Sequence, residues 1–290
     1  MSHRLSRRAP RGMVLAAALA FSTFSAFAAG LIAVGSAQAS TLPIVSIAIT
    51  PSSATVSGPL ESGGVNVAVT DTGVKEGAVV VALLKPGVSV AEAEAFQKEK
   101  KAKGDLNNVS KLASIAFDVE ANPGPKNEIQ TKLEPGQYIV LVAQGEKGQA
   151  KLLANFKVTA AKAPATLPTP QATIRTIEFG FRGPSTLHDG ELVGFENEGF
   201  LVHMDVAFPV KSNKAAKQAV KLLLAGKEKG LEKLFAGPPV TFAGPVSSGA
   251  YQQETITAKP GIYVEACFMN TQDGREHTRL GMERIIKITK

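Results

Sequence analysis

The chain has 290 residues, of which 44% are hydrophobic and 20% are charged, with one cysteine and no tryptophan. This length suits two domains that each bury a core, and the composition excludes a disordered or fibrous protein. The formal net charge of +7 becomes +3 when the four arginines of residues 1–39 are left out. Because no long basic stripe remains, we expect no nucleic-acid partner.

The first 39 residues have the pattern of a signal peptide. Four arginines precede an uncharged stretch over residues 12–35, and Ala37-Gln38-Ala39 follows as a cleavage site of the A-x-A kind. This order is typical of a leader that is removed during export. We therefore expect Ser40 as the mature N-terminus of a secreted protein, periplasmic or extracellular, with no membrane span after cleavage. The alternative is an uncleaved anchor, because the uncharged stretch is long enough to span a bilayer.

Residues 40–160 form the first predicted domain, which reads as a mostly β unit. Short apolar runs bounded by Gly and Pro predict its strands. Between the early and late strands, Ser89 and Glu92 form a capping box that opens a helix over 90–103, with Gly104 as its stop. The predicted strands cover residues 44–49, 65–69, 79–84, 114–119, 138–142 and 155–159.

Residues 161–172 read as an extended interdomain linker. Three prolines lie there among alanine and threonine, without hydrophobic periodicity. We therefore expect two domains, one on each side of this segment.

Residues 173–290 form the second predicted domain and repeat the plan of the first. Pro135-Gly136 and Pro260-Gly261 each precede an alternating strand. Ser212 can cap a helix over 213–225, and a shorter helix follows through Leu231. The predicted strands cover residues 174–181, 192–195, 203–208, 254–257, 263–268 and 284–289. Because each sheet must bury one face on another, we predict an all-β fold of two tandem β-sandwiches, each with a helical insertion.

Four side chains of the second domain offer nitrogen and sulfur donors. They are His203, Cys267, His277 and Met282. Cys267 has no second cysteine to pair with, so in an oxidising compartment its thiol needs burial or ligation. Two imidazoles, one thiolate and a weak thioether are the set that holds copper in blue-copper electron-transfer sites.

The order of these residues resembles the cupredoxin family. The resemblance rests on Phe-Glu-Asn-Glu-Gly before His203, on Pro-Gly-x-Tyr-x-x-x-Cys, and on a His-x-x-x-x-Met ending. It covers residues 173–290 with ligands and residues 40–159 as an echo of the fold without them. It implies two tandem cupredoxin-like Greek-key β-sandwiches and one copper ion in a type 1 site. His203, Cys267 and His277 would bind this ion, with Met282 as a weak axial ligand.

The same resemblance implies one-electron transfer, and a redox partner protein as the partner. Two other functions stay open. One is a metal-free β-sandwich that serves as a binding or structural module of the cell envelope, because a lone Cys, Met or His is often a packed core residue. The other is a copper carrier without a redox role. The sequence indicates no particular oligomeric state.

The first domain is expected to lack the donor set. Aligning the two Pro-Gly turns and the two C-terminal runs gives the matching positions in that domain. They are Val142 for Cys267, Val80 or Val81 for His203, Lys147 for His277 and Leu152 for Met282.

Histidine content predicts that the protein is not an enzyme. Outside the leader the chain has three histidines, and none forms the His-x-His pairs of trinuclear or type 2 copper centres. His188 lies in a turn signal, Leu-His-Asp-Gly, and is expected at the surface. Glu265 falls on the same strand face as Cys267, so we expect either that Arg279 or a nearby lysine neutralises it or that this face is open at this depth.

Overall fold

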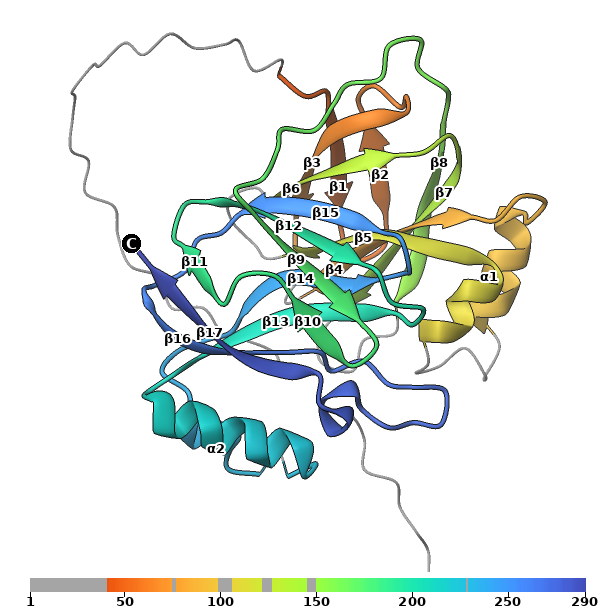
Figure 1. Cartoon of the computed structure of the whole chain (residues 1–290). Helices are drawn as coiled ribbons and strands as arrows, with labels where there is room; N and C mark the ends of the chain where they lie inside the picture. Colours follow the sequence, from red (N-terminus) through yellow and green to blue (C-terminus); the bar gives the residue numbers. More distant parts are fainter. Residues whose placement is uncertain (1–40, 75–76, 99–105, 122–126, 145–149, 228) are drawn as a thin grey trace, which may run out of the picture.

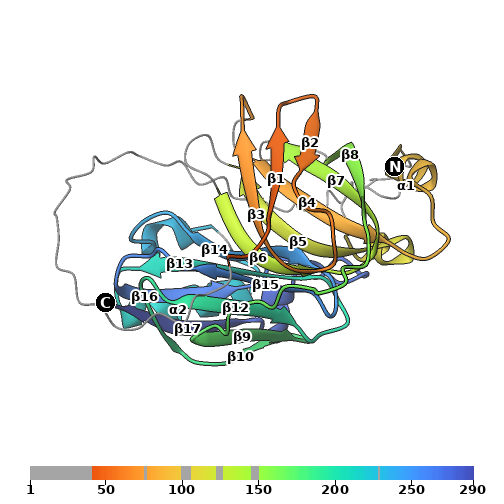
Figure 2. The same cartoon turned by 90° about the horizontal axis from the view of Figure 1, so that it is seen from above.

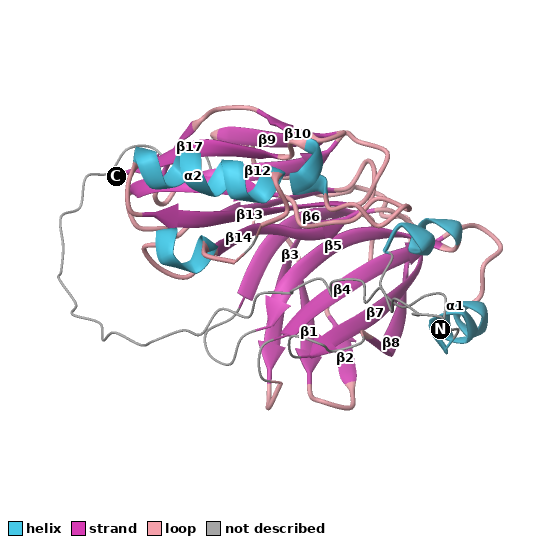
Figure 3. Cartoon of the chain, turned by 90° about the horizontal axis from the view of Figure 1, so that it is seen from below, coloured by secondary structure: helices cyan, strands magenta, loops and turns pink. Residues whose placement is uncertain are grey.

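Most of the described chain is in β-strands arranged as three sheets. The computed structural model describes residues 41–74, 77–98, 106–121, 127–144, 150–227 and 229–290. The sheets form the body of the molecule, and the helices lie on its outside (Figure 1, Figure 3). The expected leader, residues 1–39, lies outside the described residues. Within the described ranges, no helix is long and apolar enough to cross a membrane.

The strands and helices follow a similar order in the two halves of the chain, except that β11 and η4 of the second half have no counterpart among the described residues of the first. The first half holds β1 (Ile44–Ile49), β2 (Ala54–Ser57), β3 (Gly63–Asp71), β4 (Gly77–Leu84), α1 (Val90–Lys98), η2 (Leu106–Lys111), β5 (Ala113–Ala121), β6 (Asn127–Leu133), β7 (Gly136–Gln144) and β8 (Lys151–Val158). The second half holds β9 (Ala172–Ile177), β10 (Gly180–Arg182), β11 (Thr186–His188), β12 (Leu192–Asn197), β13 (His203–Val210), α2 (Asn213–Leu224), η3 (Leu231–Leu234), β14 (Val240–Val246), β15 (Tyr251–Thr255), β16 (Gly261–Ala266), η4 (His277–Leu280) and β17 (Glu283–Thr289).

One sheet runs through both halves of the chain. Its eight strands lie in the order β10-β9-β12-β15-β6-β3-β1-β2. The halves meet where β15 pairs antiparallel with β6, with Gln252 opposite Thr131 and Gln253 opposite Gln130. The other two sheets each belong to one half, in the orders β5-β4-β7-β8 and β11-β17-β16-β13-β14.

Each smaller sheet packs on its own part of the eight-stranded sheet. In the first half, buried residues of β1, β3 and β6 meet those of β4, β5, β7 and β8 around Phe117 and Tyr138. In the second half, residues of β9 and β12 meet those of β13, β14, β16 and β17 around Phe195 and Phe242. In the view from above, most strands of the first half lie in the upper part of the picture and those of the second half in the lower part (Figure 2). Burial of these apolar faces is the main stabilising term of the fold.

The helices cover the outer faces of the two smaller sheets. Helix α1 packs through Ala93 against Ala82 and Ile139. Helix α2 packs through Ala216 and Ala219 against β16 and β17. Both caps are as predicted. The Glu92 backbone N–H donates to Ser89 Oγ over 3.2 Å, and the Ala215 N–H donates to Ser212 Oγ over 3.1 Å.

The predicted strands are present with shifted ends. The expected strand 174–181 is two strands, β9 and β10, because the chain turns between them at Phe179, whose φ is +56°. The sequence did not predict β2, β6, β11 or β14. The end of the first helix, predicted over 90–103, falls on residues outside the described part of the chain.

In the predicted linker 161–172, residues 161–171 have no regular secondary structure, and Ala172 is the first residue of β9. The linker nevertheless contacts both halves. The Gly64 N–H donates to the Ala165 carbonyl over 2.7 Å, and the side-chain amide of Gln253 donates to the Pro168 carbonyl over 3.0 Å. A Cβ at Gly63 would lie 2.8 Å from the Ala165 nitrogen, so glycine is required for this close approach.

Candidate metal centre

The backbone brings three segments of the second half to one point. His203 is the first residue of β13, Cys267 directly follows β16, and His277 opens the short helix η4. Strands β13 and β16 are paired antiparallel, with Val206 opposite Ala266, so His203 and Cys267 lie at the same end of the sheet. A hydrogen bond of 2.8 Å from the His277 N–H to the Met269 carbonyl brings the loop after Cys267 back to this end.

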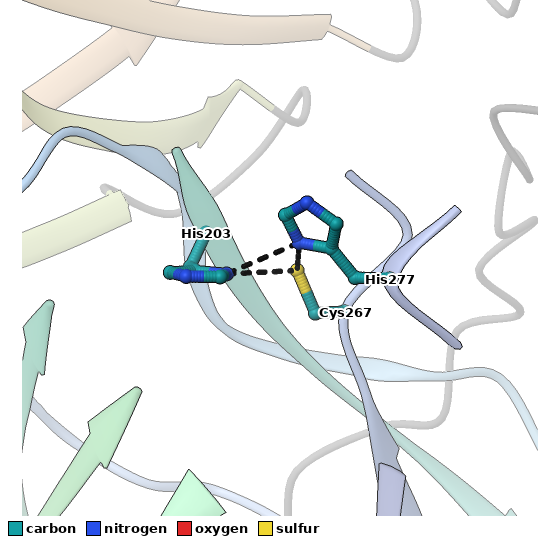
Figure 4. A group of neighbouring side chains, drawn as sticks. All are labelled: His203, Cys267 and His277. Atoms are coloured by element: carbon teal, nitrogen blue, oxygen red, sulfur yellow. Dashed lines mark hydrogen bonds between the residues drawn. The ribbon is translucent and has the colours of Figure 1, made fainter. Parts of the chain in front are cut away.

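The donor atoms of His203, Cys267 and His277 form a small triangle (Figure 4). The two Nδ1 atoms lie 3.1 Å apart, and Cys267 Sγ lies 3.7 Å from His203 Nδ1 and 3.4 Å from His277 Nδ1. A point equidistant from the three atoms lies about 2.0 Å from each, close to the roughly 2.0–2.3 Å of bonds from nitrogen and sulfur to a metal ion. The residues present therefore fit a single metal ion.

Burial sets the charge of these donors. All three side chains are fully buried. Burial lowers the pKa of His203 and of His277 to about 4, so both imidazoles are neutral near pH 7 and keep a lone pair for a metal. Burial raises the pKa of the Cys267 thiol to about 12, and the Met204 N–H, which donates to Sγ over 3.4 Å, opposes this rise. A bound cation would displace the thiol proton.

Met282, the fourth predicted donor, is fully buried next to this group. Its carbonyl accepts from the Cys267 N–H over 3.2 Å, and its N–H donates to the His277 carbonyl over 3.0 Å. The residue is therefore tied by its backbone to two of the three donors. Gly281, which has a φ of +96°, ends helix η4 and directly precedes Met282.

The turn before His203 is shaped by Asn197. Its side-chain amide donates to the carbonyls of Leu201 and Val246, and its oxygen accepts from the Gly199 N–H over 2.9 Å. A Cβ at Gly199 would lie 2.7 Å from His203 Nε2. The Asn and Gly of the Phe-Glu-Asn-Glu-Gly motif thus hold the turn that leads into His203, and no side chain other than hydrogen fits at Gly199 without displacing a neighbour.

Glu178 reaches the outer nitrogen of His203. One of its carboxylate oxygens lies 3.6 Å from Nε2 and also accepts from the backbone N–H groups of Phe200 and Leu201. These N–H groups and the neighbouring His203 hold the pKa of Glu178 below its usual value, although partial burial opposes this. Its side chain is 32% exposed, so the site has a polar edge here. Sequence reasoning did not single out Glu178.

Phe179 and the loop tip complete the surroundings of His277. The Phe179 ring lies edge-on to the His277 ring at a centroid distance of 5.2 Å. In the loop between Cys267 and His277, the Gly274 N–H donates to the Thr271 carbonyl over 2.8 Å. Asp273 and Gly274 therefore form a turn, which allows the loop of nine residues between Cys267 and His277 to close on itself.

The buried carboxylate of Glu265 pairs with Arg284. The expected partner, Arg279 or a nearby lysine, was therefore wrong. Arg284 is directly opposite Glu265 in the β16–β17 pairing and donates to its carboxylate through Nε. Asp205 is also fully buried beside this pair, and burial raises its pKa well above the usual value, with the charge of Glu265 adding to the effect. Arg279 instead lies against Gly226, just after α2.

Asn107, from the first half, joins two segments of the candidate site. Its Oδ1 accepts from the Val202 N–H over 3.0 Å, and its Nδ2 donates to the Asn270 carbonyl over 2.8 Å. Val202 precedes His203, and Asn270 lies in the loop between Cys267 and His277. No sequence signal identifies this contact, because it joins positions more than 90 residues apart.

The remaining sequence expectations are met in part. His188 lies at the end of β11 with an exposed side chain, as expected, and its Nδ1 is 2.8 Å from the Thr289 hydroxyl. The alignment of the two Pro-Gly turns matches Val140 with Glu265. Val81 pairs with Val140 as Ala207 pairs with Glu265, so this alignment sets Gly77, and not Val80 or Val81, opposite His203. Lys147 lies outside the described residues.

Comparison with known proteins gives structural likenesses only. No family model matches the chain, and no curated protein matches it. Among solved structures, auracyanin B is 16% identical and matches over 43% of this chain and 93% of its own, with a TM-score of 0.27. A Cu-containing nitrite reductase from Thermus scotoductus SA-01 is 14% identical and matches over 86% of this chain and 68% of its own, with a TM-score of 0.25. A multicopper oxidase from Aquifex aeolicus is 9% identical, with 87% and 66% covered and a TM-score of 0.27.

The prediction that the chain is not an enzyme is wrong in the light of these matches. The solved structures similar to it include nitrite reductase and multicopper oxidases, which are enzymes, beside the cupredoxins. The prediction rested on the absence of the His-x-His pairs of trinuclear and type 2 copper centres. That absence does not decide whether the protein is an enzyme.

Proposed function

We propose that the protein binds one copper ion through His203, Cys267 and His277, with Met282 as a weaker fourth ligand, and that it transfers single electrons. The observation that carries this proposal is the triangle of two imidazole nitrogens and one sulfur, with edges of 3.1, 3.4 and 3.7 Å. A copper ion held by such a set cycles between two oxidation states. A redox protein would be the partner.

The chain's own residues provide what this role requires. Burial keeps water from the donors and keeps both imidazoles neutral. The Met204 N–H donates to the sulfur, and a donor at a ligating thiolate tunes the potential of such a site. Glu178 and Asn197 hold His203 and the turn before it, so the ligand positions are fixed before a metal arrives.

Copper loading tests the proposal. Purified, reduced, metal-free protein should take up one equivalent of Cu(II) and develop an intense thiolate-to-copper absorption in the visible range. His203→Ala and Cys267→Ser should lose this band, whereas His188→Ala, which removes an exposed histidine, should keep it. Met282→Leu should keep the band and change its position. Wild-type protein that shows no such band, or a His188→Ala variant that loses it as His203→Ala does, would contradict the proposal.

Electrochemistry separates electron transfer from copper carriage. A redox protein should show a reversible one-electron couple on the copper-loaded chain. A carrier would bind Cu(I) tightly and show no reversible couple. A metal-free envelope module would gain no thermal stability from copper, since only a ligand that binds the folded state raises stability.

We also propose that the two halves are a tandem duplication of one cupredoxin-like sandwich, residues 40–160 and 173–290, joined by the linker 161–172. Three observations support this. The eight-stranded sheet has matching strands in mirrored order on the two sides of the β6–β15 contact. A helix follows the matching strands β4 and β13. In both halves a tyrosine hydroxyl donates to a carbonyl four residues earlier, Tyr138 to Glu134 and Tyr263 to Lys259.

Export is the last part of the proposal. The order of arginines, apolar residues and small residues in residues 1–39 supports it. N-terminal sequencing of the protein from its own host should find Ser40 first. A chain that still begins with Met1 and sediments with membranes would indicate an anchor instead.

A further inference from the structure

An acidic cleft lies between the two halves of the protein, and none of its lining residues is a predicted metal ligand. It has a volume of about 280 Å³ and is lined by residues of β5, β6, β14 and β15. Its carboxylates are Asp118, Glu120, Glu128 and Glu254, and we call these four residues with the space between them the acidic cleft. None of its described lining residues is Lys, Arg or His.

The floor of the acidic cleft is a buried carboxylate. Asp118 is 4% exposed, and its Oδ2 has no hydrogen-bond partner among the described residues. A Cβ at Gly244 would lie 2.0 Å from Asp118 Oδ1, so the absence of a side chain on β14 makes room for this carboxylate. An ionised carboxylate that is buried without a partner is costly, so a partner is expected at this position.

The mouth of the acidic cleft adds negative charge. Glu120 and Glu128 are exposed, and Glu254 lies between the mouth and the floor with intermediate exposure. Burial raises the pKa of Asp118 and of Glu254 to about 8, and the charge of Glu120 adds to both increases. Protons therefore compete with any bound cation for the carboxylates of Asp118 and Glu254 near neutral pH.

We propose that the acidic cleft binds a hard divalent cation such as Ca²⁺, with Asp118 as the innermost ligand. The oxygen donors that line it are carboxylates, the Gln252 amide and threonine hydroxyls, and hard cations prefer such oxygen ligands. The volume holds an ion with several water molecules.

The cation in the acidic cleft keeps part of its water shell. Among the described residues, one group of three His, Cys, Asp or Glu side chains has donor atoms that all lie within 4.8 Å of one another, and it is His203, Cys267 and His277. No three of the described carboxylates of the acidic cleft are that close together. Asp118 and at most one further carboxylate can therefore bind the ion directly, and the others act through water. A site of this kind is of moderate affinity and responds to the free cation concentration.

Thermal unfolding in the presence of Ca²⁺ tests this proposal. Metal-free protein at pH 8 should gain roughly 3–6 °C in Tm when Ca²⁺ is about tenfold above its Kd. Asp118→Asn should unfold at a higher temperature than wild type without Ca²⁺, because a buried charge is removed, and should lose the gain with Ca²⁺. Glu254→Gln should reduce the gain, and it provides a second variant if Asp118→Asn does not fold.

Matched controls isolate the acidic cleft. Glu94→Gln removes an exposed carboxylate from α1 and should keep the full response to Ca²⁺. Cys267→Ser should also keep it, because thiolate and imidazole donors do not favour Ca²⁺, so this result does not depend on copper binding. The proposal is overturned if wild type gains no stability from millimolar Ca²⁺, or if Asp118→Asn and wild type gain equally. It is also overturned if lowering the pH to 5 stabilises the protein and Ca²⁺ at pH 8 does not, because protons alone would then neutralise the cleft.

Discussion

The side-chain amide of Asn107 donates a hydrogen bond of 2.8 Å to the carbonyl of Asn270, which lies 163 positions further along the chain. The same side chain accepts from the Val202 N–H. One residue of the first half therefore fixes both the strand that carries His203 and the loop that carries His277. This gives the first half a structural role in the candidate metal centre of the second.

Replacement of Asn107 tests this role. Asn107→Ala leaves a buried N–H and a carbonyl without their partner, so stability should fall by about 1–3 kcal/mol for each group left buried and unpaired. Copper affinity should fall as well, because the separation of His203 and His277 is no longer fixed. Asn107→Asp keeps the acceptor for Val202 and loses the donor to Asn270, so its effect should be intermediate.

Urea unfolding and copper competition titrations measure these two effects. Asn155→Ala is the control, since Asn155 is an asparagine of β8 whose side chain accepts from Gln137 at the surface. If Asn107→Ala lowers stability but leaves copper affinity unchanged, the contact stabilises the junction of the halves and does not position the ligands.

Glu178 is expected to position His203. In Glu178→Ala the imidazole loses the carboxylate 3.6 Å from its Nε2, and the N–H groups of Phe200 and Leu201 lose their acceptor. Loss of such a supporting partner typically lowers metal affinity roughly 10–100-fold. Glu178→Gln keeps an acceptor oxygen and should restore most of it. Glu198→Gln, which removes a carboxylate that pairs with Arg175 over 3.1 Å, should leave affinity unchanged. Equal losses in Glu178→Ala and Glu198→Gln would show a general effect of charge.

The residues of the candidate metal centre were accessible from the sequence, and their surroundings were not. A lone cysteine with two histidines and a methionine is rare enough that residue type and order alone indicated a common site. Glu178 and Asn107 gave no such signal, because Glu and Asn are ordinary surface residues and their role here arises from contacts between distant segments. The partner of Glu265 needed the register of β16 with β17, which places Arg284 opposite it.

Strand β6 shows why the junction of the halves was missed. Its sequence, Asn-Glu-Ile-Gln-Thr-Lys-Leu over Asn127–Leu133, is mostly polar. It lacks the run of β-branched residues that is typical of a core strand. The strand is held by pairing with β3 on one side and with β15 of the other half on the other. Periodicity within one segment cannot reveal a partner 120 residues away, so the sequence predicted two separate sandwiches and not a shared sheet.

The Glu265–Arg284 pair is expected to stabilise the protein mainly by preventing an unpaired buried charge. The Glu265 side chain is fully buried and that of Arg284 is 18% exposed. Arg284→Met leaves the carboxylates of Glu265 and Asp205 together without a cation, and stability should fall by about 3–5 kcal/mol. The double variant Glu265→Gln with Arg284→Met should recover part of this loss. Arg275→Met breaks an exposed pair with Asp273 and should change stability by less than about 1 kcal/mol. A double variant no more stable than Arg284→Met alone would show that lost packing, and not the unpaired charge, dominates.

The stability of the metal-free protein should decrease as the pH rises from 6.5 to 8. In the folded state, burial raises the pKa of Asp118 and of Glu254 to about 8, whereas in the unfolded chain both titrate near their ordinary values of 3.8 and 4.5. Between these limits the folded state binds more protons than the unfolded state. Stability from these groups is therefore complete below about pH 4 and is lost as the pH approaches 8, with a slope of at most about 1.4 kcal/mol per pH unit for each group.

The choice of window separates these carboxyls from the histidines. His203 and His277 have lowered pKa values of about 4, so they reduce stability as the pH falls below 6.5 and contribute little above it. Urea midpoints of wild type and Asp118→Asn, measured in EDTA at several pH values, should converge at low pH and separate towards pH 8, with the variant more stable. Because Ca²⁺ in the acidic cleft would replace the lost protons, adding it should flatten the wild-type curve and leave that of Asp118→Asn unchanged. Parallel curves for the two proteins across this range would show that Asp118 is ionised in the folded state throughout and is already neutralised by a group of the protein.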